Sequence, residues 1–344
     1  MPQLIHLLLC FLSTNVVLGQ EREVNNVDTG NYLNYYRAVA VAEEAIVNNH
    51  YADAVLRYQK VFKDYAFNNP IDCYVASQVA SFTGDTTSCV AFIYSGLSFG
   101  LPAQTITANP HLAKIFSRLK RGAIDSCLSL YQQRIDTHAR ATMLSLIKRD
   151  QSVVKSLAYG QSLYEKDGYT LKGCYEPVWD SLVKEVIALT RKNGFPAQKV
   201  IGTQYGEDSL FKIGPNAVFV VYIFIHHGNA WQYVGDILRE ELRKGNITPQ
   251  MYGTIYESSN GQKTYNAGPV YFASRPCSDK RCRDFVKNNV DAVNKDRWAI
   301  GLCTYEVMQK KFESRAAYFT WCNRKTKDSK PYFDFQCDLS FQGL

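Results

Sequence analysis

An uninterrupted apolar run near the middle of the chain narrows the possible folds more than any other feature. It covers residues 217–225 and leads directly into His226 and His227. A run of this kind lies inside a hydrophobic core, either as a buried strand or as a buried helix. Its β-branched and aromatic residues favour a strand, whereas the helical patterns on either side favour a helix. We predict a helix, with the two histidines at the point where it leaves the core.

The composition is that of a globular protein with room for one large domain or two. Of 344 residues, 46% are hydrophobic and 21% are charged, which excludes a disordered chain. The formal net charge is +7, and the basic residues are scattered rather than gathered in one long run. Scattered basic residues are typical of a solvated surface, so we predict no nucleic-acid partner.

The N-terminal segment has the pattern of a cleaved secretory signal. Residues 1–19 contain no Lys, Arg, Asp or Glu, and an apolar stretch over residues 4–12 is followed by small residues before Gln20. This stretch is too short to span a membrane, so we predict no transmembrane anchor. Lipidation at Cys10 is an alternative, although leucines stand where a lipoprotein signal has small residues. We therefore predict an exported protein, periplasmic or extracellular.

Export makes disulfide bonds an expectation for this cysteine-rich chain. Nine cysteines follow the signal segment, so at least one is unpaired or pairs between molecules. The candidate pairs are Cys73–Cys89, Cys277–Cys282 and Cys322–Cys337. Zinc binding is the alternative, but no C-x-x-C pair occurs and no histidine lies near these cysteines in the sequence. We therefore predict neither a metal nor another cofactor.

The N-terminal region, residues 31–120, has a repeated helical pattern. Two helix-turn-helix units about 35 residues apart place small and aromatic residues at matching positions. In the first unit these are Ala42, Tyr51, Ala54 and Tyr58, and in the second they are Ala76, Ala80, Gly84 and Ala91. The pattern resembles tetratricopeptide repeats, in which small residues let paired helices approach closely. This resemblance implies an interaction surface or a scaffold, without catalytic residues.

The rest of the chain predicts a larger, mostly helical domain over residues 123–322 and a tail over residues 323–344. The expected helices cover residues 122–147, 179–192, 230–244 and much of 285–319, with an irregular or hairpin stretch over residues 252–272. Gly194 and Gly245 follow two of these helices directly, as C-terminal caps do. The predicted fold class is mainly α: tetratricopeptide-like hairpins, then a larger helical domain with a small irregular or hairpin insertion.

The two histidines cannot both face one small site, because neighbouring side chains on a helix point about 100° apart. One is expected to face the core or a cleft, and the other to face solvent. The sequence has no H-E-x-x-H motif, no G-x-S-x-G motif and no phosphate-binding glycine loop beside them. A hydrogen-bonded histidine that closes a hydrophobic segment is the structural interpretation of either one.

Short motifs spread over residues 145–305 resemble an uncharacterised family of bacterial domains that are often exported. They are Asp150-Gln151, Gly194-Phe195-Pro196, His227 after the apolar run, and Asn294-x-x-Arg297-x-x-x-Gly301-Leu302. The chain departs from the family where Glu257-Ser258 replaces Asp-Arg and where the tyrosine motif reads Tyr265-Asn-Ala-Gly. Ser258 cannot supply the planar set of hydrogen-bond donors that the arginine of the family would provide. The family has no established activity that the resemblance could lend.

Two functions from different classes follow, and we favour the first. It is an exported scaffold that binds a protein or a small molecule of unknown identity. The alternative is a hydrolase-like acid/base enzyme. In that enzyme His227 would be the general base, Asp150, Glu257 and Arg297 would assist it, and Gln151, Tyr265 and Asn294 would bind substrate. It requires these side chains to meet within hydrogen-bond reach. A third, weaker interpretation makes His227 a metal ligand.

Overall fold

The computed structural model describes residues 30–164, 172–203, 219–227, 229–259, 269–273, 276–277, 280–324 and 333–335. These residues form fifteen helices and contain no strand, so the predicted mainly α fold is confirmed. None of the described helices is both long enough and apolar enough to cross a membrane.

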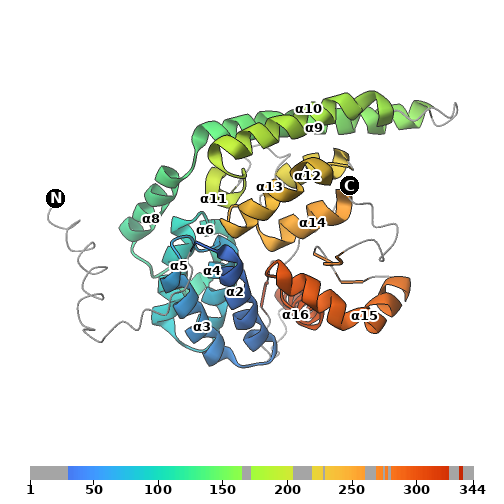
Figure 1. The fold of residues 1–344 in the computed structure, drawn as a ribbon. Coiled ribbons are helices and arrows are strands. Elements are labelled where there is room, and N and C mark those ends of the chain that lie inside the picture. Colours follow the sequence, from blue (N-terminus) through green and yellow to red (C-terminus); the bar gives the residue numbers. More distant parts are fainter. Residues whose placement is uncertain are drawn as a thin grey trace.

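The N-terminal region is a set of helices joined by short connections (Figure 1). They are α2 (Tyr32–Val47), α3 (Tyr51–Asp64), α4 (Pro70–Phe82), α5 (Thr86–Ser98), α6 (Ala103–Ala108) and α7 (Ala113–Phe116). The side chains of Asn31, Asn69 and Asp85 accept hydrogen bonds from first-turn N–H groups and so begin α2, α4 and α5.

Small residues form the contacts inside the first helix pairs. Ala42, Ala54, Ala76 and Ala80 are fully buried, and α2 packs on α3 as α4 packs on α5. Tyr58 is fully buried beside them. The predicted helix pairs are therefore present, while the relationship to tetratricopeptide repeats stays a prediction.

Two long helices, α9 (Thr137–Tyr164) and α10 (Lys172–Asn193), lie side by side in the middle of the chain (Figure 1). They follow α8 (Arg121–Arg134) and precede the short α11 (Gln198–Ile201). The single helix predicted over residues 122–147 is wrong, because the helix is interrupted at Ile135 and Asp136. Oδ1 of Asp136 accepts the N–H of Ala139 at 2.8 Å, and this cap begins α9 anew.

The C-terminal half contains α12 (Phe219–His227), α13 (Trp231–Arg243), α14 (Pro249–Ser259), α15 (Lys280–Ala299) and α16 (Tyr305–Arg324). Helix α12 contacts α9, α10 and α14, and the described part of the apolar run, residues 219–225, is helical as predicted. The irregular stretch predicted over 252–272 is wrong at its start, since α14 continues to Ser259. Residues 269–273 form no helix or strand.

The two glycine caps have the backbone that was expected of them. Gly194 has φ 87° and Gly245 has φ 72°, a left-handed conformation that favours glycine. At Gly245 a Cβ would also lie 2.4 Å from the ring of Tyr32, so this helix end packs directly on α2.

One hydrophobic cluster extends from Tyr32 to Phe335 and joins the N-terminal helices to the rest of the chain. A smaller cluster packs around α15 and α16, with Val270 and Phe272 among its members. Helix α16 packs on α2 (Figure 1), so the two ends of the described chain meet.

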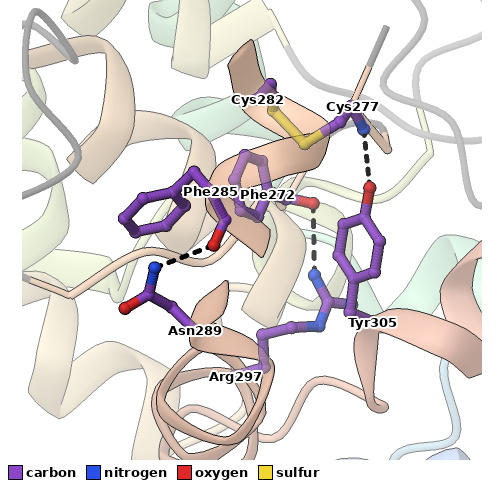
Figure 2. The surroundings of a disulfide bond; sticks show 7 residues. All are labelled: Phe272, Cys277, Cys282, Phe285, Asn289, Arg297 and Tyr305. Atoms are coloured by element: carbon purple, nitrogen blue, oxygen red, sulfur yellow. Dashed lines mark hydrogen bonds between the residues drawn. A yellow bond between two sulfur atoms is a disulfide. The ribbon is translucent and has the colours of Figure 1, made fainter. Parts of the chain in front are cut away.

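Cys277 and Cys282 form a disulfide at the start of α15 (Figure 2), as predicted. The predicted pair Cys73–Cys89 is wrong: both thiols are free and buried in the core. The thiol of Cys73 instead contacts the hydroxyl of Ser95 at 3.6 Å. The predicted Cys322–Cys337 pair and Cys10 involve side chains outside the described residues.

Candidate functional site

A buried carboxylate on α9 holds the first of the two adjacent histidines. Asp150 is 1% exposed, and its two oxygens lie 2.8 and 3.0 Å from Nδ1 of His226. Nε1 of Trp179 donates to Oδ1 at 3.2 Å, and Nε2 of Gln151 donates to Oδ2 at 3.0 Å. The ring of Tyr222 stacks on the imidazole. Asp150 therefore joins α9, α10 and α12, and it fixes the orientation of His226.

The second histidine turns to a different carboxylate. Nε2 of His227 lies 2.6 Å from Oδ1 of Asp180, and its Nδ1 accepts the backbone N–H of Asn229 at 3.3 Å. Because Nδ1 accepts, Nε2 carries the proton and donates it to Asp180. This hydrogen bond lowers the pKa of the Asp180 carboxyl. Sequence analysis did not identify Asp180 as a partner.

The two histidines differ in whether a ring nitrogen remains without a hydrogen bond to a described residue. Both ring nitrogens of His227 are engaged in hydrogen bonds. Nδ1 of His226 faces Asp150, and no described residue forms a hydrogen bond with its Nε2. An imidazole held at Nδ1 by a carboxylate, with Nε2 outward, has the geometry of a general base. If acid/base chemistry occurs here, His226 is the better placed of the two.

Glu257 binds backbone N–H groups of the segment 269–273. The amides of Tyr271 and Ala273 donate to its two oxygens at 3.0 and 3.1 Å. Burial raises the pKa of Glu257 to about 7, while these hydrogen bonds and the nearby Arg297 act in the opposite direction. The Glu257 carboxylate thus accepts backbone N–H groups of this segment, as the carbonyl groups of a neighbouring strand would do in a sheet.

Arg297 binds the carbonyl groups of the same segment. Arg297 is 1% exposed, and its guanidinium donates to the carbonyl oxygens of Tyr271 and Phe272. Figure 2 shows the bond to Phe272. Nε donates to the carbonyl oxygen of Cys303 at 2.7 Å. A planar fork of donors suits three convergent carbonyls. Arg297 therefore fastens this segment and the start of the α15–α16 connection to α15.

The rest of the Asn294–Leu302 motif ends one helix and begins the next. Gly301 has φ 89°, and the N–H of Leu302 donates back to the carbonyl of Arg297 at 2.9 Å, which is the Schellman arrangement of a helix end. Oδ1 of Asn294 accepts the N–H of Tyr305 at 2.7 Å and supports the first turn of α16. The motif has a complete structural explanation.

The hydrogen bonds of the described residues divide the four predicted catalytic side chains among three places. Asp150 contacts His226, while Glu257 and Arg297 hold the segment 269–273, and His227 belongs to neither set. Of the predicted binding residues, Gln151 contacts Asp150, Asn294 caps α16, and Tyr265 lies outside the described residues. Nor does the described part of the chain include three His, Cys, Asp or Glu side chains grouped to hold a metal ion.

A small polar pocket lies between α2, α4 and the α15–α16 connection. Its volume is about 40 Å³, room for two or three water molecules at roughly 10–15 Å³ each. Lys311 and Glu43 meet there at 2.6 Å, and Asp72 accepts the hydroxyl of Tyr35 at 2.8 Å. Burial and the nearby charge of Glu43 raise the pKa of Asp72 to about 7.

Asp72→Asn should stabilise the protein at pH 8 and have little effect at pH 4. The folded state holds the Asp72 proton more tightly than the unfolded chain does. The stabilisation from that proton is complete below pH 4 and is lost as the pH rises through about 7. Asparagine keeps an acceptor for Tyr35 without the buried charge, so we expect a gain of about 1–3 kcal/mol at pH 8. Urea unfolding across this pH range measures it, and equal curves for both proteins would contradict the prediction.

Residues 333–335, the tail segment, also contact parts of the chain that are far away in the sequence. Phe333, Asp334 and Phe335 are 2%, 5% and 1% exposed. The described side chains that bind them belong to α3, α4, the connection before α7, and α16. Seven of them form the tail-binding surface: Tyr51, Tyr74, Gln78, Phe82, His111, Lys311 and Arg315.

Each part of the tail segment has its own kind of contact on this surface. The ring of Phe333 lies 5.6 Å from that of Tyr51 and 6.0 Å from that of Phe82, centroid to centroid. The backbone of Asp334 pairs with the amide of Gln78, whose side chain is fully buried. The sequence signal of this site is the aromatic–acidic–aromatic triplet Phe333-Asp334-Phe335.

No family model matches the chain, and no curated protein or solved structure matches it either. The family resemblance of residues 145–305 therefore stays a prediction.

Proposed function

We propose that the protein is an exported binding protein whose N-terminal helices hold an extended polypeptide segment. The observation that carries the proposal is the pairing of the Gln78 side chain with the backbone of Asp334. Oε1 of Gln78 accepts the N–H of Asp334 at 2.9 Å, and Nε2 donates to its carbonyl oxygen at 3.1 Å. A primary amide that pairs with both backbone groups of one residue recognises main chain, as a neighbouring strand does.

The buried position of Gln78 strengthens the argument for polypeptide binding. A buried amide without partners costs about 1–3 kcal/mol for each unsatisfied group, so a segment that covers Gln78 must offer it both a backbone N–H and a carbonyl. In the structure, the occupant is the tail of the same chain. Any extended segment offers the same N–H and carbonyl pair, which makes the site suited to another polypeptide.

Two features support export. The uncharged, apolar residues 1–19 have the pattern of a secretory signal. The Cys277–Cys282 disulfide is the kind of bond that forms in oxidising compartments outside the cytosol. We propose the periplasm or the extracellular space as the place of binding.

The second candidate function is acid/base hydrolysis at His226. The geometry that favours it is the carboxylate of Asp150 at Nδ1, 2.8 Å away, in a side chain that is 16% exposed. This orientation leaves Nε2 to take a proton from a substrate or a water molecule. Gln151 and Trp179 would then act by holding Asp150.

The test of polypeptide binding uses the full chain with Phe333→Ala and Phe335→Ala, which removes both aromatic anchors of the tail. Fluorescence anisotropy measures binding of a labelled peptide with the sequence of residues 331–336. We expect this opened variant to bind at least about tenfold more tightly than the intact chain, in which the tethered tail competes at a millimolar effective concentration. The added change Gln78→Leu should remove the gain, because leucine cannot pair with a backbone.

Circular dichroism of each variant separates loss of binding from loss of fold. A folded opened variant that binds no extended peptide, whatever its sequence, would show that the Gln78 pairing serves only the architecture of this chain.

A further inference from the structure

We propose that the tail-binding surface selects segments with an acidic residue between two aromatic residues, and that residues 333–335 are its built-in competitor. The inference rests on the proposed binding function and names the class of partner: a polypeptide with an aromatic–acidic–aromatic triplet in an extended conformation. Main-chain pairing through Gln78 would admit any extended segment. The selection comes from the contacts of the three side chains.

The carboxylate of Asp334 has one hydrogen-bond donor and one ion-pair partner from different parts of the chain. The hydroxyl of Tyr74 donates to Oδ2 at 3.2 Å, and the guanidinium of Arg315 forms an ion pair with the carboxylate, with Nε 3.3 Å from Oδ1. Asp334 is 5% exposed, so its charge depends on these partners rather than on water. A neutral or basic residue at this position would remove the ion pair with Arg315.

Tyr74 is itself oriented toward the acid by a third residue. Nδ2 of Asn109 donates to the oxygen of Tyr74 at 2.8 Å, and the phenol also has a hydrogen bond with Tyr318. Burial raises the pKa of Tyr74, which keeps the phenol protonated at every ordinary pH. Tyr74 thus stays a donor, and its hydroxyl donates to the carboxylate of Asp334.

Aromatic contacts on either side of the acid define the two flanking positions. Phe333 lies among Tyr51, Phe82 and His111, with the His111 ring nearly parallel to it at 6.2 Å. Phe335 is 1% exposed and lies under the ammonium group of Lys311, which is 5.5 Å from the ring centroid. A cation over an aromatic face favours Phe, Tyr or Trp at this position over an aliphatic residue.

The experiment compares three labelled peptides on the opened variant. They carry the sequence of residues 331–336 with aspartate, asparagine or arginine at the central position. We expect the aspartate peptide to bind about tenfold more tightly than the asparagine peptide, since one charge-assisted contact is worth about 1.5 kcal/mol or more. The arginine peptide should bind most weakly.

The variant Arg315→Glu, made in the opened background, should reverse this order and favour the arginine peptide. If Arg315→Glu does not fold, the affinities of the aspartate and asparagine peptides for the opened variant, which keeps Arg315, still test the selectivity. Equal affinity for all three peptides would overturn the selectivity while leaving the proposed function standing. Absence of binding by every peptide to a folded opened variant would overturn both. The affinities of the same three peptides can also be compared on the single variant Asp334→Asn, which keeps both phenylalanines.

Discussion

Replacing Arg297 by methionine should lower the free energy of unfolding by about 3–5 kcal/mol, the cost of removing one partner from a buried charged network. The guanidinium donates to the carbonyl oxygens of Tyr271, Phe272 and Cys303 in a site that excludes solvent. Methionine fills a similar space and donates to none of them. The same change removes the nearest positive charge from the buried carboxylate of Glu257.

The matched control is Arg37, which also donates to two backbone carbonyls. Its bonds to the oxygens of Trp298 and Ala299 lie at the surface, at 3.1 and 3.4 Å. Arg37→Met should therefore cost less than about 1 kcal/mol. Arg297→Lys should recover only part of the loss, because a single ammonium cannot span three carbonyls. Urea unfolding followed by circular dichroism measures all three, and equal losses for Arg297→Met and Arg37→Met would refute the argument.

Local features of the sequence predicted local structure well. The apolar run 217–225 is a helix where it is described, Gly194 and Gly245 end helices, and the cysteines five residues apart are bonded. Each of these depends on residues close together in the chain. The prediction of a Cys73–Cys89 pair failed because these cysteines lie on two different helices, α4 and α5, and both thiols are free and buried in the core.

The candidate site was harder to predict because its partners are far apart in the chain. Asn294, Arg297 and Gly301 are residue types found both in binding sites and in helix caps, and only the contact of Arg297 with Tyr271 shows which role they have. The sequence correctly indicated that the two histidines face different sites, but the prediction that one faces solvent is wrong, because their side chains are only 16% and 9% exposed. Their carboxylate partners could not be assigned from the sequence. Asp150 is 76 residues from His226, and Asp180 is 47 residues from His227.

Asp150→Ala should also be strongly destabilising, by about 2–4 kcal/mol. Its carboxylate accepts hydrogen bonds from His226, Trp179 and Gln151 at 2.8–3.2 Å. Alanine leaves these donors without a partner where α9, α10 and α12 meet, and each unsatisfied buried group costs about 1–3 kcal/mol. Urea unfolding monitored by tryptophan fluorescence measures the loss, because Trp179 belongs to the contact.

Asp180→Ala is the control, since Asp180 is the carboxylate of the neighbouring histidine. Its side chain is 47% exposed, against 1% for Asp150, so water replaces it and the stability should change little. An equal loss of unfolding free energy in Asp180→Ala and Asp150→Ala would show that burial does not determine how much these His–Asp pairs stabilise the protein.

His226→Gln separates the structural role of the pair from an acid/base role. Glutamine keeps an N–H donor for Asp150 but has no basic nitrogen, so the variant should be more stable than Asp150→Ala. We expect hydrolysis of chromogenic ester, peptide and glycoside substrates by the intact chain, if present, to disappear in His226→Gln and to survive in His227→Gln. An activity that behaves in the opposite way would place the base at His227. With no activity in the intact chain, the second candidate function fails, and Asp150 is a structural link between three helices.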